Sequence, residues 1–244
     1  MATSNKIPKL KRFIIIFGSK GGLGKTAYAR FLLDELIRLN INYCAYDADR
    51  ENPDLYRYYH TVGTGVELVD FLNIGEAGQL LENMSVNAPD VVVLDLPASS
   101  GNGTREIFEK FGLLDTAVEL GYRITLLCVI NTDDPVIASI TMMADFCTDK
   151  VDYVIVKNLC WGKAQEFKRW DEGNLKHTII KDLKGIEIEM PNLDPSAFLS
   201  LSKQKTPYHL ADKDTVGFAS SLLVKGFTIA ARSEFIKANN YWGI

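Results

Sequence analysis

The sequence is poor in cysteine, and its few cysteines are not arranged for metal or redox chemistry. Among 244 residues there are four, Cys44, Cys128, Cys147 and Cys160, and none form a Cys-x-x-Cys pair. Cys44 and Cys128 fall within apolar runs, where a thiol behaves as a small hydrophobic side chain. This arrangement argues against a disulfide scaffold, a zinc site or an iron–sulfur cluster.

The sequence also lacks long hydrophobic runs and a strong excess of positive charge. No stretch approaches the roughly 18 consecutive apolar residues that a membrane span needs, and no signal-type segment precedes the first predicted strand. The formal net charge is −4, so the chain is not a globally basic nucleic-acid binder, although local basic patches remain open. We therefore expect a cytoplasmic protein.

The composition supports one sizeable hydrophobic core. Hydrophobic residues make up 47% of the sequence, and no linker-like stretch divides it. Residues 1–12 are polar and basic and are predicted to form a flexible tail. We expect a single domain over residues 13–244.

The most informative stretch is a glycine-rich segment between an apolar run at residues 13–17 and a helical pattern from Tyr28. It reads Gly18-Ser19-Lys20-Gly21-Gly22-Leu23-Gly24-Lys25-Thr26. Strand, glycine-rich turn and helix form the context of a phosphate-binding loop, in which backbone N–H groups and the helix N-terminus surround an anion. Lys25 is predicted to reach the β- and γ-phosphates, and the Thr26 hydroxyl to bind Mg²⁺. A glycine-rich turn with incidental lysines is the competing interpretation.

This segment departs from the usual phosphate-loop pattern. The first glycine of that pattern would stand at Ser19, and a second lysine is present at Lys20. Lys20-Gly21-Gly22-x-Gly24-Lys25-Thr26 resembles the deviant phosphate loop of the ParA/MinD family of ATPases. The resemblance implies that Lys20 crosses the interface of an ATP-dependent homodimer and touches the partner's nucleotide, so that Lys20 and Lys25 both serve catalysis. It also implies that ATP binds along Gly21, Gly22, Leu23, Gly24, Lys25, Thr26 and Ala27.

Alternating apolar runs and helical stripes predict the fold class. Continuous apolar runs at residues 91–94, 124–130 and 153–156 are typical of strands buried on both faces of a parallel sheet. We therefore expect an α/β, P-loop NTPase fold, with a predominantly parallel sheet covered by helices on both faces. Residues 61–78 are expected to hold a short helix, and residues 104–120 another. The last helix is expected to pack on the sheet through Val216, Ala219, Leu223, Phe227 and Ala230.

Acidic residues follow two of the predicted strands. Asp47 and Asp49 end one strand, and Asp95 ends another, at the sheet edge where ligands bind in open α/β folds. Asp95 is predicted to be a Walker-B type residue that holds Mg²⁺ together with Thr26 and Asp47. By resemblance, Asp49 orients the attacking water. The family continues with Pro-Gln where this chain has Arg50-Glu51, and solvated aspartates in a strand-end turn are the alternative.

Two loops and one asparagine complete the predicted nucleotide site. Residues 96–103 follow Asp95 and suit a nucleotide-sensing switch, or alternatively a plain surface loop. By resemblance, Asn158 lies against the adenine base; an asparagine in a turn is the competing interpretation. Residues 190–195 resemble a loop that closes over the base in related ATPases.

Two surface features are candidate partner sites. The tyrosines around Tyr56, Tyr58 and Tyr59 are either a dimer or partner surface or a buried stripe. The C-terminal quarter is locally basic and is expected to bind DNA nonspecifically when ATP brings two copies together. Its cations are Lys203, Lys205, Lys213, Lys225, Arg232 and Lys237.

Together, these patterns predict an ATPase that switches between a monomer and an ATP-bound dimer. By resemblance, it partitions or positions DNA or another large cargo, with ATP and Mg²⁺ as cofactors, and a ParB-like or other adaptor stimulates hydrolysis. Short plasmid-encoded relatives linked to stability or conjugative transfer fit its size, and a DNA-bound form would be nucleoid-associated. The alternatives are a MinD-like ATPase on a membrane and a metabolic ATP-dependent enzyme of the same fold.

Overall fold

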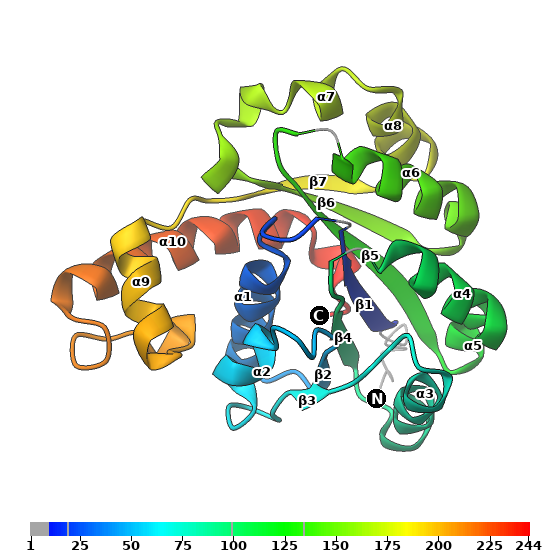
Figure 1. Cartoon of the computed structure of the whole chain (residues 1–244), viewed down its shortest axis with the longest axis horizontal. Helices are drawn as coiled ribbons and strands as arrows, with labels where there is room; N and C mark the ends of the chain where they lie inside the picture. The colour runs from blue at the N-terminus through cyan, green and yellow to red at the C-terminus, as the bar shows by residue number, and fades with distance from the viewer. Residues whose placement is uncertain (1–9, 19, 99, 134) are drawn as a thin grey trace, which may run out of the picture.

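In the computed structural model, a single parallel sheet organises the chain (Figure 1). The structure describes residues 10–18, 20–98, 100–133 and 135–244, so most of the predicted tail at residues 1–12 lies outside the described residues. The strand order is β3-β2-β4-β1-β5-β6-β7, and every pairing is parallel. The strands are β1 Lys11–Phe17, β2 Tyr43–Asp47, β3 Glu67–Leu68, β4 Val91–Asp95, β5 Tyr122–Ile130, β6 Asp152–Asn158 and β7 Ile186–Met190.

Helices cover both faces of this sheet, as the continuous apolar runs predict. In Figure 1, α1 and α10 lie on one side of the sheet, and α4, α5 and α6 lie on the other. Because both faces are covered, β1 and β4 are buried along almost their whole length. The helices are α1 Lys25–Arg38, α2 Asp54–Tyr59, α3 Ile74–Asn87, α4 Gly101–Phe111, α5 Leu113–Glu119, α6 Pro135–Cys147, α7 Lys168–Asp171, α8 Asn174–His177, α9 Pro195–Gln204 and α10 Phe218–Lys237.

The register of the strands brings the predicted site residues to one edge of the sheet. Asp47 at the end of β2 is paired with Asp95 at the end of β4, and Ile16 of β1 pairs with Asp95 from the other side. The phosphate-loop segment leaves β1 directly after Phe17. The sheet therefore places the glycine-rich loop and both acid clusters side by side.

Two predicted helices are wrong in extent. The short helix expected within residues 61–78 is not formed; this stretch contains β3, and α3 begins only at Ile74. Asn73 starts α3 by accepting hydrogen bonds from the backbone N–H groups of Gly75 and Glu76. The helix expected over residues 104–120 is divided into α4 and α5, because Gly112 adopts a left-handed conformation with φ of 54°.

The packed face of the last helix also differs from the prediction. Of the five residues expected on that face, Val216 and Phe227 are buried, whereas Ala219, Leu223 and Ala230 are exposed. The buried face consists of Val224, Phe227, Ala231 and Phe235. Apolar residues occur on every side of α10, so periodicity alone could not select the side that meets the sheet.

Candidate nucleotide-binding site

The glycine-rich loop between β1 and α1 has a backbone that requires glycine at two positions. Gly22 and Gly24 have φ of 76° and 97°, in the left-handed region that side chains disfavour. A Cβ at Gly24 would also collide with the amide nitrogen of Asn158. Ser19 lies outside the described residues. The loop thus has the tight turn that a phosphate-binding loop needs at the start of a helix.

Lys25 is a buried lysine at the first position of α1. Only 7% of the residue is exposed, and its Nζ donates a hydrogen bond to the backbone oxygen of Lys20 at 3.2 Å. Burial lowers its pKa, while the nearby carboxylates of Asp95 and Asp49 act in the opposite direction. The ammonium group is therefore held inside the loop, with few competing partners for an anion.

Thr26 and Asp95 form the second polar pair of the site. Asp95 is almost fully buried, and its Oδ1 has no hydrogen-bond partner among the described residues. Burial raises the pKa of Asp95 to about 7, although a hydrogen bond from Thr26 acts in the opposite direction. An unpaired buried carboxylate oxygen beside a threonine hydroxyl fits a divalent cation with oxygen ligands.

Asp47 and Asp49 have different positions although they are two residues apart. Both carboxylate oxygens of buried Asp47 accept backbone hydrogen bonds, from Asp49 and from Tyr56, each at 3.0 Å. Burial nevertheless raises the pKa of Asp47 to about 6. Asp49 is half-buried, lines the cleft described next and accepts a hydrogen bond from the Asn52 backbone at 3.0 Å. Asp47 therefore holds the turn and the start of α2, and its role as a metal ligand stays a prediction.

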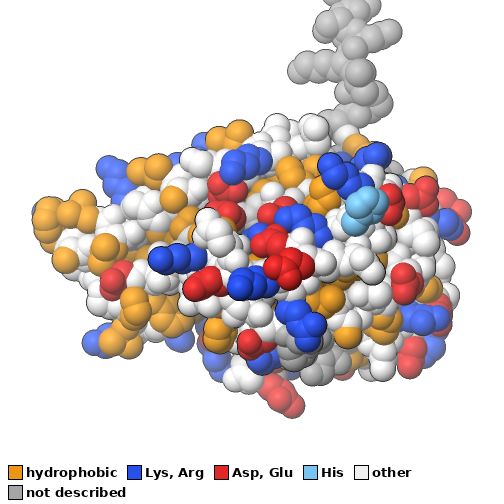
Figure 2. All heavy atoms as spheres, turned by 90° about the horizontal axis from the view of Figure 1, so that it is seen from above, with side chains coloured by type: hydrophobic (Ala, Val, Ile, Leu, Met, Phe, Trp, Pro, Cys, Tyr) orange, Lys and Arg blue, Asp and Glu red, His pale blue; other side chains and the backbone are white. Residues whose placement is uncertain are grey.

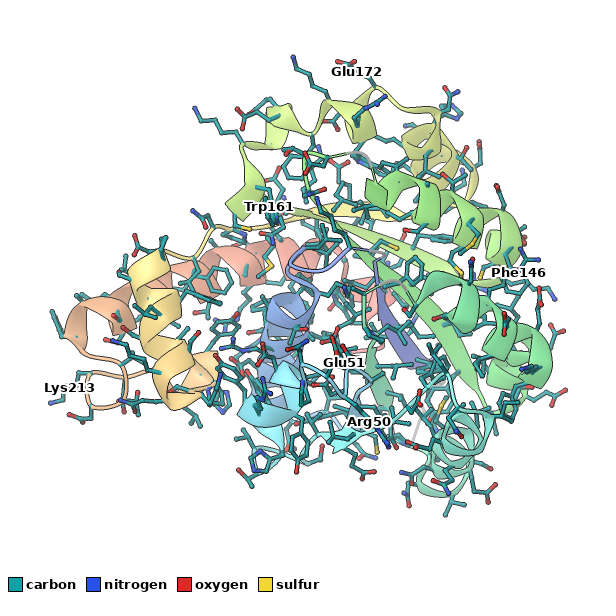
Figure 3. All side chains as sticks on the ribbon, viewed as in Figure 1. Arg50, Glu51, Phe146, Trp161, Glu172 and Lys213 are labelled. Atoms are coloured by element: carbon teal, nitrogen blue, oxygen red, sulfur yellow. The ribbon has the colours of Figure 1, made fainter. Side chains whose placement is uncertain are left out.

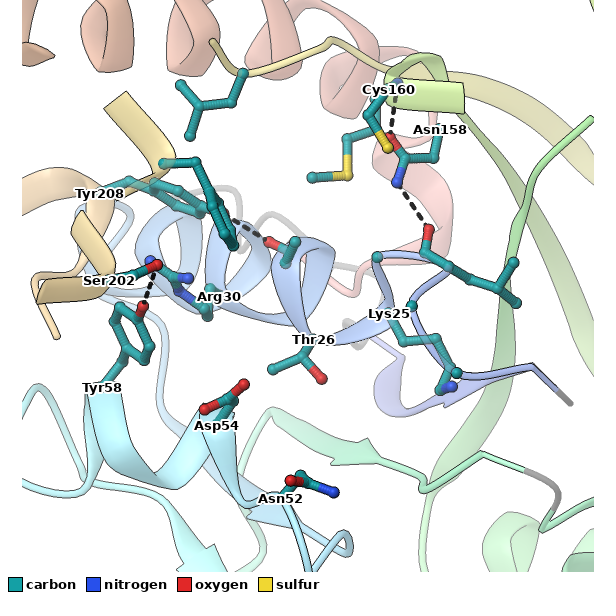
Figure 4. A pocket seen from close by; sticks show the side chains of 18 of the residues that line it. Lys25, Thr26, Arg30, Asn52, Asp54, Tyr58, Asn158, Cys160, Ser202 and Tyr208 are labelled. Atoms are coloured by element: carbon teal, nitrogen blue, oxygen red, sulfur yellow. Dashed lines mark hydrogen bonds between the residues drawn. The ribbon is translucent and has the colours of Figure 1, made fainter. Parts of the chain in front are cut away.

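The phosphate loop and Asp49 open onto a cleft of about 920 Å³ (Figure 4). The phosphate-loop segment forms one wall, from Gly21 to Ala27, and Asp49, Asn158 and residues 190–193 line other parts of it. Met190, which is paired with Asn158 in the sheet, and Cys160 also line the cleft. The cleft thus contains all of the residues predicted to bind ATP, whereas Lys20, Asp47 and Asp95 are not among its lining residues.

Comparison with known proteins agrees with this arrangement. No family model matches the chain. Protein MobD of Acidithiobacillus ferrooxidans is 26% identical to this chain over 186 residues, which cover 75% of this chain and 78% of MobD.

Solved structures share the fold at low sequence identity. MinD in the MinC:MinD cell division protein complex of Aquifex aeolicus superposes with a TM-score of 0.54 and 16% identity, covering 92% of this chain and 96% of that one. MinD of Pyrococcus horikoshii, complexed with Mg-ADP, has a TM-score of 0.54 and 13% identity, covering 94% of this chain and 98% of that one. A ParA family ATPase of Chlorobium tepidum has a TM-score of 0.51 and 13% identity, covering 90% of this chain and 99% of that one. The chain has the fold of the MinD and ParA ATPases.

Within this MinD/ParA fold, Lys20 lies at the rim of the cleft. Its side chain is 45% exposed, and its Nζ is 3.3 Å from the Oδ2 of Asp133, which follows β5. An exposed pair of this kind contributes about 0–1 kcal/mol. Lys20 is therefore available to a second molecule at small energetic cost.

Asn158 bridges the phosphate loop and the segment after β6. Its Nδ2 donates to the backbone oxygen of Leu23 at 2.7 Å, and its Oδ1 accepts from the backbone N–H of Cys160 at 3.2 Å (Figure 4). Both ends of the amide are thus engaged within the protein. The contact with adenine stays a prediction, and the observed contacts give Asn158 a part in shaping the loop.

The departure at Arg50-Glu51 ties the loop after β2 to α3. Figure 3 labels both side chains on this loop. Arg50 forms an ion pair with Glu76 at 2.5 Å, and Glu76 also accepts a hydrogen bond from the backbone of Asp70. The segment that carries Asp49 is therefore held by a contact that a proline could not make.

The far end of the cleft contains residues that sequence reasoning missed. Arg30 is 3% exposed and lies between two rings, with its guanidinium carbon 3.5 Å from the ring centre of Tyr58 and 4.6 Å from that of Tyr208. Tyr58 also hydrogen-bonds Ser202 of α9 at 3.3 Å (Figure 4). The only signal in the sequence was the position of Arg30 in α1, one turn after Thr26.

The two candidate partner surfaces look different in the structure. Tyr58 and Tyr59 are buried, which supports the interpretation as a buried stripe. In the basic quarter, Arg232 pairs with Glu35 at 2.7 Å, Lys237 pairs with Glu234 at 2.5 Å, and Lys205 lies over the Tyr58 ring. Fewer free cations remain for DNA than the composition suggests.

Proposed function

We propose that this protein is an ATPase that dimerises on binding ATP and positions or partitions a large cargo, with DNA as the favoured cargo. The observation that carries the proposal is that Lys25, Thr26 and Asp49 line one cleft, with exposed Lys20 at its rim. Buried Asp95 lies directly behind Thr26 and Lys25. We further propose that it acts in the cytoplasm and is nucleoid-associated when bound to DNA.

The phosphate loop and Lys25 hold the triphosphate in this scheme. The backbone N–H groups of residues 21–26 and the ammonium group of Lys25 offset the phosphate charge. Thr26 and the unpaired Oδ1 of Asp95 are the groups that would hold Mg²⁺, and the ion would supply positive charge to the phosphates.

Asp49 is the candidate for orienting the attacking water. It lines the same cleft as Lys25, and its position is fixed by Asp47 behind it and by Asn52 after it. Catalysis of phosphoryl transfer depends mostly on positioning and charge stabilisation. A carboxylate fixed in this way suits the first of these two tasks.

Lys20 makes hydrolysis depend on a second copy of the chain. In a two-fold dimer each subunit gives the same residue to the other, so two nucleotides would be completed by two Lys20 side chains. The Asp133 pair must first open, which an exposed ion pair permits. A partner protein that stimulates hydrolysis would then reset the dimer to monomers.

The variant Lys20→Ala tests this proposal. We expect it to bind ATP as the wild type does, because Lys25 and the loop amides remain, but to stay monomeric and inactive. Size-exclusion chromatography with light scattering in ATP and Mg²⁺ measures dimerisation, and phosphate release measures turnover. Lys110→Ala, which removes another exposed lysine on α4, is the control and should dimerise normally. A stable ATP dimer of Lys20→Ala would refute the proposed role.

A further inference from the structure

Helix α10 carries large apolar residues on two opposite faces, of which one is covered. Its buried face packs on α9, β7 and α1, for example through Phe235 against Phe31 and Phe227 against Tyr208. A helix on the surface of a globular protein is normally apolar only on the face that it buries. In the part of the chain that the structure describes, nothing covers the opposite face of α10.

The uncovered face carries a stripe of large apolar side chains along the helix. Phe218, Leu222, Ile229 and Ile236 are 69%, 53%, 53% and 62% exposed. Of the sixteen large hydrophobic residues found exposed in the described chain, eight lie between residues 198 and 236. In Figure 2, hydrophobic side chains gather at the end of the molecule where α9 and the start of α10 lie. Exposed apolar side chains gathered in this way indicate an interaction site.

The spacing of this stripe is that of a helix–helix seam. The seam positions alternate in steps of four and three, which keeps one line of side chains facing a partner helix as in a heptad repeat. They are Phe218, Leu222, Lys225, Ile229, Arg232 and Ile236.

Gly226 lies beside the seam, in the middle of α10. A glycine inside a helix costs about 1 kcal/mol relative to alanine. Apart from its chain neighbours and the backbone of α10 itself, a Cβ at this position would have no atom of the described chain within 4 Å, so packing within the chain does not explain the glycine. The gap lets the backbone of another helix approach closely.

Charge indicates what kind of helix fits. Residues 195–233 contain five lysines or arginines, and their only acidic residues are Asp212 and Asp214 in the turn before α10. On the seam, Arg232 is already paired with Glu35, whereas the side chain of Lys225 has no partner among the described residues. A parallel second copy would set Lys225 against Lys225, which like charges disfavour.

We propose that the outer face of α10 docks an amphipathic helix of a partner protein, with apolar residues on its seam and an acidic residue opposite Lys225. This surface suits the adaptor protein of the proposed function. The inference rests on that function in one respect only, which is that the ATPase has a protein partner. The docking itself requires neither nucleotide nor dimerisation.

The test uses a fluorescein-labelled synthetic helix of three heptads, with leucine at the seam positions and one glutamate placed to face Lys225. Fluorescence anisotropy should show saturable binding to the full-length protein. Leu222→Glu and Ile229→Glu should each weaken it at least about tenfold, because a charge would then be buried in the seam. Val118→Glu, at an exposed valine of α5, is the matched control and should bind like the wild type.

A charge exchange tests the predicted orientation. Replacing the peptide glutamate by lysine should weaken binding about tenfold, and Lys225→Glu should restore it. Circular dichroism melts should leave Ile229→Glu as stable as the wild type, because its side chain is exposed.

Four outcomes would overturn the proposal. One is no saturable binding of the peptide, and another is an equal loss in Val118→Glu. A third is a nucleotide-free dimer that Ile229→Glu abolishes, which would assign the face to a second copy. The fourth is Ile229-dependent retention on labelled duplex DNA or phosphatidylglycerol vesicles without peptide binding. ATP-dependent dimerisation of Ile229→Glu, measured in parallel, reports separately on the proposed function.

Discussion

At the scale of single residues, the site depends on charges kept away from water. Lys25 and Asp95 are both buried and lie near each other, so each favours the charged form of the other while burial disfavours it. Asp47 lies next to Asp95 but satisfies its oxygens with backbone N–H groups. An anion bound at the loop would offset the positive charge of Lys25, and a cation bound at Asp95 would offset its negative charge.

Lys25→Ala should therefore lose most of its affinity for ATP. A charge-assisted contact with phosphate disappears, and such contacts are worth about 1.5–3 kcal/mol, or roughly ten- to a hundredfold in affinity. Isothermal titration calorimetry with Mg²⁺-ATP measures the loss, and a thermal melt checks that the variant is folded. Unchanged binding would show that the loop does not hold the phosphates.

Sequence alone predicts the residues whose role follows from a local pattern. The phosphate loop was recognisable because its glycines and lysines lie within one short segment, and Asp49 and Asp95 because each ends an apolar run. Arg30, Tyr58 and Tyr208 meet only in the fold, since α1, α2 and the turn before α10 are far apart in sequence. The hydrogen bond from Asn158 to the backbone oxygen of Leu23 likewise joins residues that are 135 positions apart in the sequence.

At the scale of elements, buried polar contacts fix the C-terminal segment on α1. Glu35 accepts hydrogen bonds from both Arg232 of α10 and Arg38 of α1. Asp34, one residue earlier, accepts hydrogen bonds from Tyr59 at 2.6 Å and from the backbone N–H of His209 at 2.9 Å. These contacts select one orientation of a helix whose apolar pattern fits several.

The contact between His209 and Asp34 should make stability depend on pH. His209 Nδ1 lies 2.6 Å from Asp34, and this hydrogen bond raises the pKa of the imidazole. The stabilisation is complete below the ordinary pKa of about 6.5 and is lost as pH rises through the higher folded value. Tyr59 and Arg30 also face Asp34, and neither changes charge in this range.

His209→Gln should thus cost about 1–2 kcal/mol of unfolding free energy at pH 5.5, and less at pH 9. Urea unfolding at both pH values measures the difference. His177→Gln is the control, because His177 is exposed and 3.6 Å from Asp182. Parallel pH profiles for His209→Gln and the wild type would contradict this assignment.

The same elements show where sequence reasoning about the fold ends. Buried strands appear in the sequence as continuous apolar runs, so the parallel sheet and its two covered faces were predictable. The side of α10 that meets the sheet was not predictable, because Phe218, Leu222 and Ile229 are as apolar as the residues that are buried. Contacts with distant residues such as Glu35 decide it.

At the scale of the whole molecule, the proposed cycle requires chemistry and assembly to be separable. Lys20 lies at the rim and would act between subunits, whereas Asp49 lies inside the cleft and would act on water. Loss of Lys20 should prevent the dimer from forming. Loss of Asp49 should instead leave a dimer that cannot return to monomers.

Asp49→Ala should bind ATP, dimerise and hydrolyse it about a hundredfold or more slowly, because a positioned group that assists proton transfer contributes 10²–10⁴-fold. Light scattering after size exclusion should show a persistent dimer in ATP and Mg²⁺, while phosphate release shows the lost turnover. Glu51→Ala removes an exposed acid from the same loop and should behave as the wild type. A wild-type turnover rate for Asp49→Ala would remove this residue from the chemical step, and a monomer in ATP would place its role in assembly instead.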